Sequence, residues 1–445
     1  MGLTETILKP LGRSRAGANL PHFKNTAEQQ TVIMPPPATV AIPLKQHIGV
    51  PCNCLVKPGD KVFVGTVIGD NEAAMCCPVH SSVSGTVKEI SSLTTAAGDV
   101  DCVVIESDGE MTPEPSLTAP EVKTADDIIA AARNCGLVGL GGAGFPVHIK
   151  ISAGTREDID TLIINCAECE PYITADYREC MEAYDDIIEG LYLLREFFNF
   201  KKIIIGVEDN KPKAIAKLYE IAADHRDEDD TVKLMKLKSR YPQGAEKMLV
   251  YSATKRKIPA GKLPADVGCI VMNITTVSTL YHYIKTGMPL VAKRVTVDGG
   301  GIATPQNVLV PIGTALKDII EFCGGCSENT NKVLLGGPMM GVAVKETSSV
   351  VTKNTNAVLC LADEKSVSTT PCIRCGRCAA ACPMYLTPAA VEGAVNRNDI
   401  SDLNSLNVNM CIECGSCSFV CPASRPLTPA MRTAKFEMRR NSNGK

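Results

Sequence analysis

Residues 136–150 read GLVGLGGAGFPVHIK. Within them, residues 139–144 satisfy G-x-G-x-x-G, the pattern of dinucleotide-binding Rossmann domains. That pattern must follow a strand and open a helix, whereas here a helix is expected before the glycines and Pro146 follows them at once. The context therefore disfavours a Rossmann domain. We expect instead a loop of bare backbone that can lie close to a flat ring or a phosphate.

The sequence around this loop alternates between helical and strand patterns. Thr124 and Asp127 form a capping box before DIIAAARNCG, and Gly136 ends that helix. Buried strands are expected at TLIIN (161–165) and KIIIGV (202–207). Strands that alternate with helices indicate an α/β domain with a largely parallel sheet, which we place at residues 123–290.

Two smaller β regions flank this domain. Residues 1–106 contain short alternating strands and resemble the barrel-sandwich hybrid of lipoyl and biotinyl carrier domains. The cofactor-carrying lysine of those carriers has no counterpart near Ser82–Ser84, so we expect a structural module. A Pro-rich linker is expected at residues 107–122. Residues 291–345 are similar to the β-grasp SLBB module, and a polar linker is expected at 346–366.

The chain has 445 residues, 21 cysteines and a net charge of −3. No apolar run is long enough for a transmembrane helix, and we expect no secretory signal. In such a chain many cysteines indicate metal ligation in a reducing compartment rather than disulfides. The small net charge gives no indication of nucleic-acid binding.

The C-terminal region contains two copies of the pattern C-x2-C-x2-C-x3-C-P. Three thiolates on such a tight loop each reach a corner of a 4Fe–4S cube, whereas the fourth, before proline, ligates the other cluster. The doubled spacing favours clusters over zinc, so we expect a helical, ferredoxin-like domain with two 4Fe–4S clusters at residues 367–445. The first cluster should be ligated by Cys372, Cys375, Cys378 and Cys421, and the second by Cys411, Cys414, Cys417 and Cys382.

Other cysteines and histidines also invite a metal interpretation. Three pairs among the remaining cysteines suggest further metal ligands: Cys76 and Cys77, Cys166 and Cys169, and Cys323 and Cys326. A free cysteine is commonly a small buried hydrophobe, and we interpret these residues in that way. We expect structural roles for His47, His80 and His148, because no metal-like partners accompany them.

The glycine loop and three later segments resemble the NADH-oxidising flavoprotein subunit of respiratory complex I. GLGGAGFPVHIK matches its flavin loop, NCAECEP its N-x-x-E-x-E-P segment, and YPQGAEKML and IVMNITTVSTL its Y-x-x-G-x-E and Asn/Thr segments. One difference is Ala245, where that family has a glutamate. The resemblance places these residues at FMN and NADH positions: Gly139, Gly141, Gly142, Gly144, Phe145, Lys150, Asn165, Glu168, Glu170, Tyr241, Gly244, Glu246, Asn273 and Thr276.

The resemblance also implies roles for individual residues. The glycines would let backbone amides approach FMN, and Lys150 would offer a cation to a phosphate or to reduced flavin. Asn165 would hydrogen-bond the ring, Glu170 would hold a nicotinamide ribose or amide, and Phe145 would stack on the nucleotide. FMN supplies the exchange between hydride and single-electron transfer, and the protein supplies placement and electrostatics.

Structural roles remain as alternatives for several of these residues. Lys150 could be a solvated surface cation, and Phe145 could belong to the core. Glu168 could cap a helix or pair with Arg178. We expect Asp176 and Arg178, within TADYRE, to form a structural ion pair.

The complete order of domains is similar to that of the C subunit of the Rnf complex, the ion-translocating ferredoxin:NAD oxidoreductase of bacteria and some archaea. VAIPLKQHIGVP, PVHSSVSGTV, INCAECEPYITADYR, YPQGAEK and GGPMMG match its signatures, whereas GANLPHFKNT departs from its Gly-Gly-x-His-Pro-Pro pattern. The resemblance implies a peripheral NADH/FMN/iron–sulfur subunit on the cytoplasmic face of the cell membrane. Its partners would be NADH, the membrane subunits and, through the complex, ferredoxin. Either Na⁺ or H⁺ could be the transported ion.

Two other functions compete with this interpretation. A soluble cobalamin reductase of the propanediol-utilisation type shares the flavin, SLBB and cluster parts, but it typically begins near the glycine loop, so residues 1–120 argue against it. An electron-transfer scaffold with a decayed flavin site is opposed by the intact set of Gly141, Asn165, Glu170 and Glu246.

Overall fold

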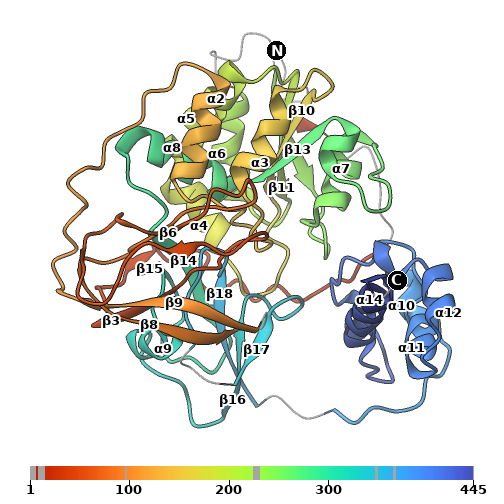
Figure 1. The fold of residues 1–445 in the computed structure, drawn as a ribbon. Coiled ribbons are helices and arrows are strands. Elements are labelled where there is room, and N and C mark those ends of the chain that lie inside the picture. The colour runs from red at the N-terminus through yellow and green to blue at the C-terminus, as the bar shows by residue number, and fades with distance from the viewer. Residues whose placement is uncertain are drawn as a thin grey trace.

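The computed structural model describes residues 7–8, 16–95, 98–223, 231–345, 349–363 and 367–443. Within these ranges the chain forms four β-sheets, helices around one of them, and a C-terminal group of short helices (Figure 1). None of the helices in the described ranges combines the length and the apolar character needed to cross a membrane.

The N-terminal β region contains two antiparallel sheets. Its strands are β3 (Thr39–Pro43), β4 (Asn53–Cys54), β5 (Lys61–Val62), β6 (Val67–Asp70), β7 (Val79–His80), β8 (Gly85–Thr95) and β9 (Gly98–Ser107). One sheet has the order β3-β9-β8-β5 and the other β4-β6-β7. Val103 and Ile105 of β9 point into a shared core, whereas Glu106 is exposed, the alternation expected of a sheet with one face in solvent.

The α/β domain is built on a parallel sheet. Its strands are β1 (Ile7–Leu8), β10 (Thr161–Cys166), β11 (Lys202–Glu208), β12 (Val232–Leu237) and β13 (Cys269–Asn273). They run in the order β1-β12-β11-β10-β13, and every pair is parallel. Leu162 and Ile164 belong to the core on one face and Ile163 to the core on the other. Both faces are therefore buried, which explains why the strands are continuous apolar runs in the sequence.

Helices cover the two faces of this sheet (Figure 1). They are α2 (Ala125–Asn134), α3 (Val147–Ser152), α4 (Ala175–Glu182), α5 (Tyr184–Phe197), α6 (Pro212–Ala222), α7 (Glu246–Thr254) and α8 (Ile274–Thr286), with short 3-10 turns η1 (Ala153–Thr155) and η2 (Pro264–Val267). Side chains of α5, α6 and α8 enter the core on one face, and those of α7 enter the core on the other. The capping box of Thr124 and Asp127 is present at the start of α2, as the sequence predicts.

The β-grasp region forms a mixed sheet. Its elements are β14 (Ala292–Asp298), β15 (Gln306–Pro311), α9 (Leu316–Phe322), β16 (Thr330–Leu335), β17 (Val342–Val344) and β18 (Ala357–Ala362), joined by β2 (Val32–Ile33), and the strand order is β17-β16-β18-β14-β15-β2. Strand β18 lies inside residues 346–366, where the sequence predicts a linker. That prediction is wrong for residues 357–362, because AVLCLA is a buried apolar strand that pairs with β14 and β16.

Residues 16–31, which we call the N-terminal strap, do not join the barrel-sandwich sheets. They cross the other domains instead, and Phe23 stacks on Tyr172 with ring centroids 4.9 Å apart. The hydrogen bonds of the strap main chain join Gly17 to Ala381, Ala18 to Tyr241 and Thr26 to Asn307. The strap therefore connects the C-terminal, α/β and β-grasp domains.

The C-terminal domain is helical. Its elements are α10 (Arg377–Ala381), α11 (Pro388–Asn396), α12 (Ile400–Ser405), η3 (Val408–Met410), α13 (Ser416–Phe419) and α14 (Leu427–Asn443). Val391, Leu403, Met431 and Met438 belong to a separate core. In Figure 1 these blue helices form a distinct unit beside the rest of the molecule.

Two buried histidines predict that acid lowers the stability of this fold. Burial, together with the nearby Lys353 ammonium, lowers the pKa of His47 to about 4 and that of His80 to about 3. Both rings are neutral in the folded protein, whereas in the unfolded chain they are protonated below about pH 6.5. The titration of these histidines therefore does not change the free energy of unfolding above about pH 6.5. Below that pH it lowers the free energy of unfolding, increasingly so until the pH reaches the folded pKa values.

Replacing His80 with Gln should remove one of these contributions, about 2 kcal/mol at a pH of about 5. Urea unfolding of the parent and the variant between about pH 5 and 8 measures the effect. His282→Gln is the control, because that side chain is 53% exposed. A His80→Gln protein with the parent's pH dependence would show that the ring is not kept neutral.

Candidate functional site

The glycine loop lies between α2 and α3 and is closed by a hydrogen bond from Gly139 N to Phe145 O (2.8 Å). Its tip, residues 141–143, is exposed. Gly142 has φ of +115°, and among the described residues the only atom within 4 Å of the position of a Cβ there is Nδ2 of Asn356, 4.0 Å away. The tip is thus bare backbone beside open space, which fits the approach of a flat ring.

Two asparagines lie side by side at the carboxyl ends of β10 and β13. Asn165 and Asn273 are in register in these neighbouring strands. Nδ2 of Asn165 donates to Gly244 O (2.9 Å), and Oδ1 of Asn273 caps α8 by accepting from the amides of Thr275 and Thr276. The carboxyl edge of an open parallel sheet is where ligands bind in α/β folds.

The start of α8 also contacts the glycine loop. Oγ1 of Thr276 accepts a hydrogen bond from Leu140 N (3.1 Å). A Cβ at Gly141 would lie 3.5 Å from the Asn273 side chain, an ordinary van der Waals contact. The structure therefore brings the glycine loop next to Asn273 and Thr276. Leu140 and Thr276 are 136 positions apart in the chain.

Lys150 and Glu246 form an ion pair at the half-exposed rim of the sheet edge. Nζ of Lys150 donates to Oε1 of Glu246 (2.9 Å) and to Val271 O (2.9 Å). The two side chains are 26% and 38% exposed. Lys150 is thus held in place by the protein, and it is not the solvated surface lysine of the alternative interpretation.

Glu168 is buried and bonded within the protein. Its Oε1 accepts from Asp176 N (2.8 Å) in the first turn of α4, and its Oε2 accepts from Nζ of Lys211 (3.3 Å). Burial raises the pKa of Glu168, and Lys211 opposes that shift. The helix-capping alternative therefore describes its contacts, whereas the suggested pairing with Arg178 is wrong because Lys211 is the cationic partner.

Glu170 joins the α/β domain to the GGPMMG stretch of the β-grasp domain. Its two oxygens accept from the amides of Met339 and Met340, both at 3.0 Å, and Tyr241 Oη is 3.4 Å from Oε1. Burial raises the pKa of Glu170, and these three donors oppose the shift. Its carboxylate therefore already binds this chain at the place where the resemblance implies a nicotinamide contact.

The ion pair expected between Asp176 and Arg178 is absent from the described contacts of these two residues. Arg178 pairs with Glu182, four residues further along α4 (2.5 Å). Asp176 instead accepts from Nδ2 of Asn273 and Oγ1 of Thr275, both at 2.7 Å. Side chains two apart on a helix do not face each other, which is why the sequence prediction is wrong.

Sequence reasoning missed Lys24, which lies in the strap behind the N-x-x-E-x-E-P segment. Its Nζ donates to the carbonyl oxygens of Glu168 (2.9 Å), Glu170 (2.8 Å) and Ile173 (2.5 Å). Burial lowers the pKa of Lys24, and Glu168 opposes the shift. GANLPHFKNT contains no periodic pattern that marks this lysine, so its role becomes visible only from the fold.

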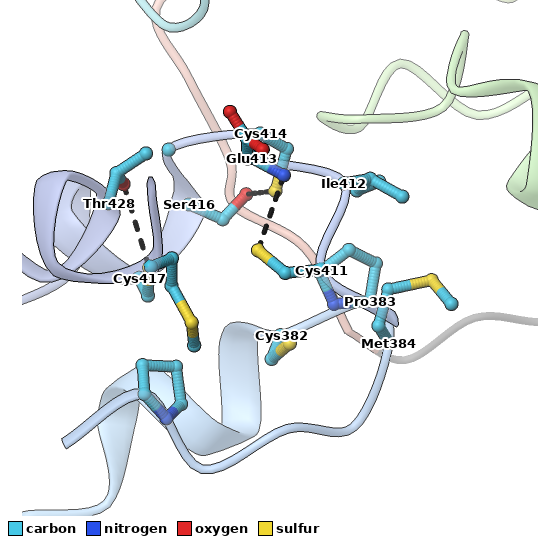
Figure 2. A pocket seen from close by; sticks show the side chains of 13 residues that line it. Cys382, Pro383, Met384, Cys411, Ile412, Glu413, Cys414, Ser416, Cys417 and Thr428 are labelled. Carbon is cyan, nitrogen blue, oxygen red and sulfur yellow. Dashed lines mark hydrogen bonds between the residues drawn. The ribbon is translucent and has the colours of Figure 1, made fainter. Parts of the chain in front are cut away.

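The eight cysteines of the C-terminal motifs line two cavities, four to each. Cys382, Cys411, Cys414 and Cys417 surround one cavity, and Figure 2 shows their side chains around a common space. Cys372, Cys375, Cys378 and Cys421 surround the other, whose volume is about 230 Å³. These are the two sets expected from the sequence, with the cysteine before each proline contributed to the opposite motif.

The two cavities differ in their surroundings. Cys372 and Cys375 are exposed, whereas Cys382 and Cys414 are buried. Next to Cys414, the backbone of Gly415 approaches Met339 so closely that a Cβ would lie 2.8 Å from Met339 O. The cavity of Cys382 and Cys414 therefore adjoins the loop that Glu170 holds.

Most of the other cysteines singled out in the sequence lie in hydrophobic cores. Cys76, Cys77, Cys166 and Cys323 are buried, as expected of small apolar side chains, whereas Cys326 is exposed. Across the described ranges no three His, Cys, Asp or Glu side chains could hold a single metal ion. The thiolates of a 4Fe–4S cube each bind a different iron, so this finding bears on mononuclear sites.

Replacing Lys24 with Met should destabilise the protein by about 3 kcal/mol, because three carbonyl groups lose a charged donor. Urea unfolding measures the loss. Lys213→Met is the matched control, since that lysine also contacts the strap, through Glu28, but is 62% exposed. Equal stability of the two variants would exclude the proposed structural role of Lys24.

Family models match the chain in the order of its domains. They are the RnfC barrel sandwich hybrid domain at residues 13–110, the Nuo51 FMN-binding domain at 132–282, the SLBB domain at 294–343 and a 4Fe-4S dicluster domain at 364–422. This order confirms the fold class predicted from the sequence.

Curated relatives match over most of the chain. The identity is 40% over 434 residues with the C subunit of the Na⁺-translocating ferredoxin:NAD⁺ oxidoreductase complex of Acetobacterium woodii, covering 96% of this chain and 97% of the relative. The identity is 39% with the C subunit of the proton-translocating ferredoxin:NAD⁺ oxidoreductase complex of Clostridium ljungdahlii, covering 82% of this chain and 80% of the relative. It is 37% with the C subunit of the ion-translocating oxidoreductase complex of Rhodobacter capsulatus, covering 85% of this chain and 74% of the relative. The chain therefore belongs to the family of C subunits of ion-translocating ferredoxin:NAD⁺ oxidoreductase (Rnf) complexes.

Proposed function

We propose that this chain binds FMN and NAD(H) at the carboxyl edge of its parallel sheet, next to a domain with two 4Fe–4S clusters. In this role it is a peripheral subunit of an ion-translocating ferredoxin:NAD⁺ oxidoreductase. The observation that best supports this function is the contact between the two sites. Glu170 follows β10 and binds the Met339 and Met340 amides, and Met339 adjoins Gly415 of the second cysteine motif. We call the carboxyl ends of β10 and β13, together with the glycine loop, the flavin edge. This edge and a cluster cavity thus share the loop of Met339 and Met340.

The FMN site consists of the glycine loop, Asn165, Lys150 and the start of α8. The exposed tip at residues 141–143 provides backbone for close contact with the ring. Lys150 provides a fixed cation, because Glu246 and Val271 O hold its ammonium. When bound, FMN exchanges a hydride with nicotinamide and single electrons with iron–sulfur clusters.

The two cysteine quartets have different positions in this arrangement. Cys382, Cys411, Cys414 and Cys417 form the set next to the flavin edge, because Gly415 packs on Met339. Cys372 and Cys375 of the other set are exposed, and the cavity wall between them includes Ile373 and Arg374. This second set is the more accessible one and suits exchange with another subunit.

The partners are the other subunits of the complex, among them its membrane subunits, and ferredoxin reached through them. The names of the relatives support a multi-subunit ion-translocating assembly. We place the chain on the cytoplasmic face, where NADH is found. A cobalamin reductase is not favoured, because residues 13–110 match the RnfC barrel sandwich hybrid domain.

Replacement of Cys378 with Ala should remove one cluster, about four of about eight irons per chain, because alanine offers no ligand in place of the fourth thiolate. Iron analysis and the visible absorption of anaerobically purified protein provide the measurement. Cys326→Ala is the control, since that exposed cysteine lies outside both cavities. Full iron content in the Cys378→Ala protein would contradict the assignment of the cavity.

NADH should be preferred over NADPH by about tenfold or more, because a carboxylate that accepts from a ribose hydroxyl repels a phosphate there. Glu246 is the half-exposed candidate for this contact. Glu246→Gln should raise the NADH concentration for half-maximal reduction of an artificial acceptor several-fold, with the iron content unchanged. Equal rates with both nucleotides, or a variant with the parent's NADH dependence, would refute the role of this glutamate.

A further inference from the structure

The carboxylate of Asp176 joins the two segments that flank the proposed flavin site. Its Oδ2 accepts from Nδ2 of Asn273, and its Oδ1 accepts from Oγ1 of Thr275, each at 2.7 Å. Its own amide donates to Glu168 in the N-x-x-E-x-E-P segment (2.8 Å). Asp176 thus connects the segment after β10 with the start of α8 after β13.

These bonds fix the orientation of the Asn273 side chain. An ionised carboxylate only accepts hydrogen bonds, so the Asn273 nitrogen must face Asp176 and its oxygen must face the amides of Thr275 and Thr276. A Cβ at Gly141 would lie 3.5 Å from the Asn273 side chain, so the glycine loop passes close to it, and Oγ1 of Thr276 accepts from the amide of Leu140. The glycine loop therefore rests on residues whose orientation Asp176 determines.

We propose that Asp176 is a positioning residue for FMN, which orients Asn273 and the start of α8 beneath the glycine loop. This inference rests on the proposed flavin site. Asp176 does not need to touch the flavin for this role, because it acts through Asn273. A purely structural role, holding α4 to α8, predicts a loss of stability without a specific effect on the flavin.

The test compares three variants with the parent protein, each purified with its flavin bound. Asp176→Asn keeps the shape of the side chain but presents one oxygen where the carboxylate has two. The exchanged pair Asp176→Asn with Asn273→Asp keeps an amide facing a carboxylate, and aspartate still caps α8. Asp160→Asn is the matched control, because Asp160 also accepts from a threonine hydroxyl and from a second side chain, here Arg256, but at the amino end of β10.

FMN release on dilution, followed by flavin fluorescence, gives the dissociation constant. Potentiometric titration gives the flavin midpoint potential, and thermal unfolding gives the stability. Asp176→Asn should raise the dissociation constant at least about tenfold and shift the potential, the exchanged pair should recover most of the affinity, and Asp160→Asn should lower only the stability.

Two results overturn the inference. One is parent affinity and parent potential in the Asp176→Asn protein. The other is loss of affinity in proportion to stability, with Asp160→Asn and Asp176→Asn affected alike. A parent protein that binds no FMN would instead refute the proposed flavin site itself, and would be recognised before any variant is compared.

Discussion

Charged groups behind the proposed flavin edge must be neutralised inside the protein, and this constraint determines several contacts between domains. Lys211 is buried and lies 3.3 Å from Glu168 and 3.6 Å from Glu208, which are also buried. Lys24 adds a second cation from the N-terminal strap, bound to main-chain oxygens of the same segment. Removal of Lys211 would leave the two buried carboxylates without this cation, which is costly in a low-dielectric interior. The segment after β10 therefore requires α6 and the strap to be in place.

The same segment determines where the C-terminal domain lies. Glu170 follows the end of β10 closely in the chain and binds the amides of Met339 and Met340. The Met339 backbone in turn adjoins Gly415, where no side chain would fit. The strap makes an independent connection, from Gly17 to Ala381. The distance between the proposed flavin edge and this cluster cavity is thus fixed by close contacts that involve main-chain groups. Such contacts allow less variation in that distance than a flexible linker does.

The sequence predicted those parts of the site that are encoded locally. Each cysteine motif supplies three ligands within seven residues, so the spacing alone indicates both cavities. The glycine loop is equally local. Lys24 and Glu168 are 144 positions apart, and no local pattern reveals their contact. Strand β18 was missed because its partners, β14 and β16, come from elsewhere in the chain. The true partner of Asp176 was missed for the same reason, since Asn273 lies 97 residues away.

The carboxylates that the family resemblance places at nucleotide positions differ in their burial and in how many of their oxygens are already hydrogen-bonded. Glu168 and Glu170 have both oxygens bonded by groups of this chain, and burial raises the pKa of each. A nucleotide that bound either one would have to replace those bonds. Glu246 is bonded through one oxygen, to a lysine that also binds Val271 O, and is 38% exposed. An acceptor at the rim can bind a ribose hydroxyl without breaking a contact between domains. We therefore assign discrimination among nucleotides to Glu246, whereas Glu170 binds the loop next to the cluster domain and Glu168 binds the start of α4 and Lys211.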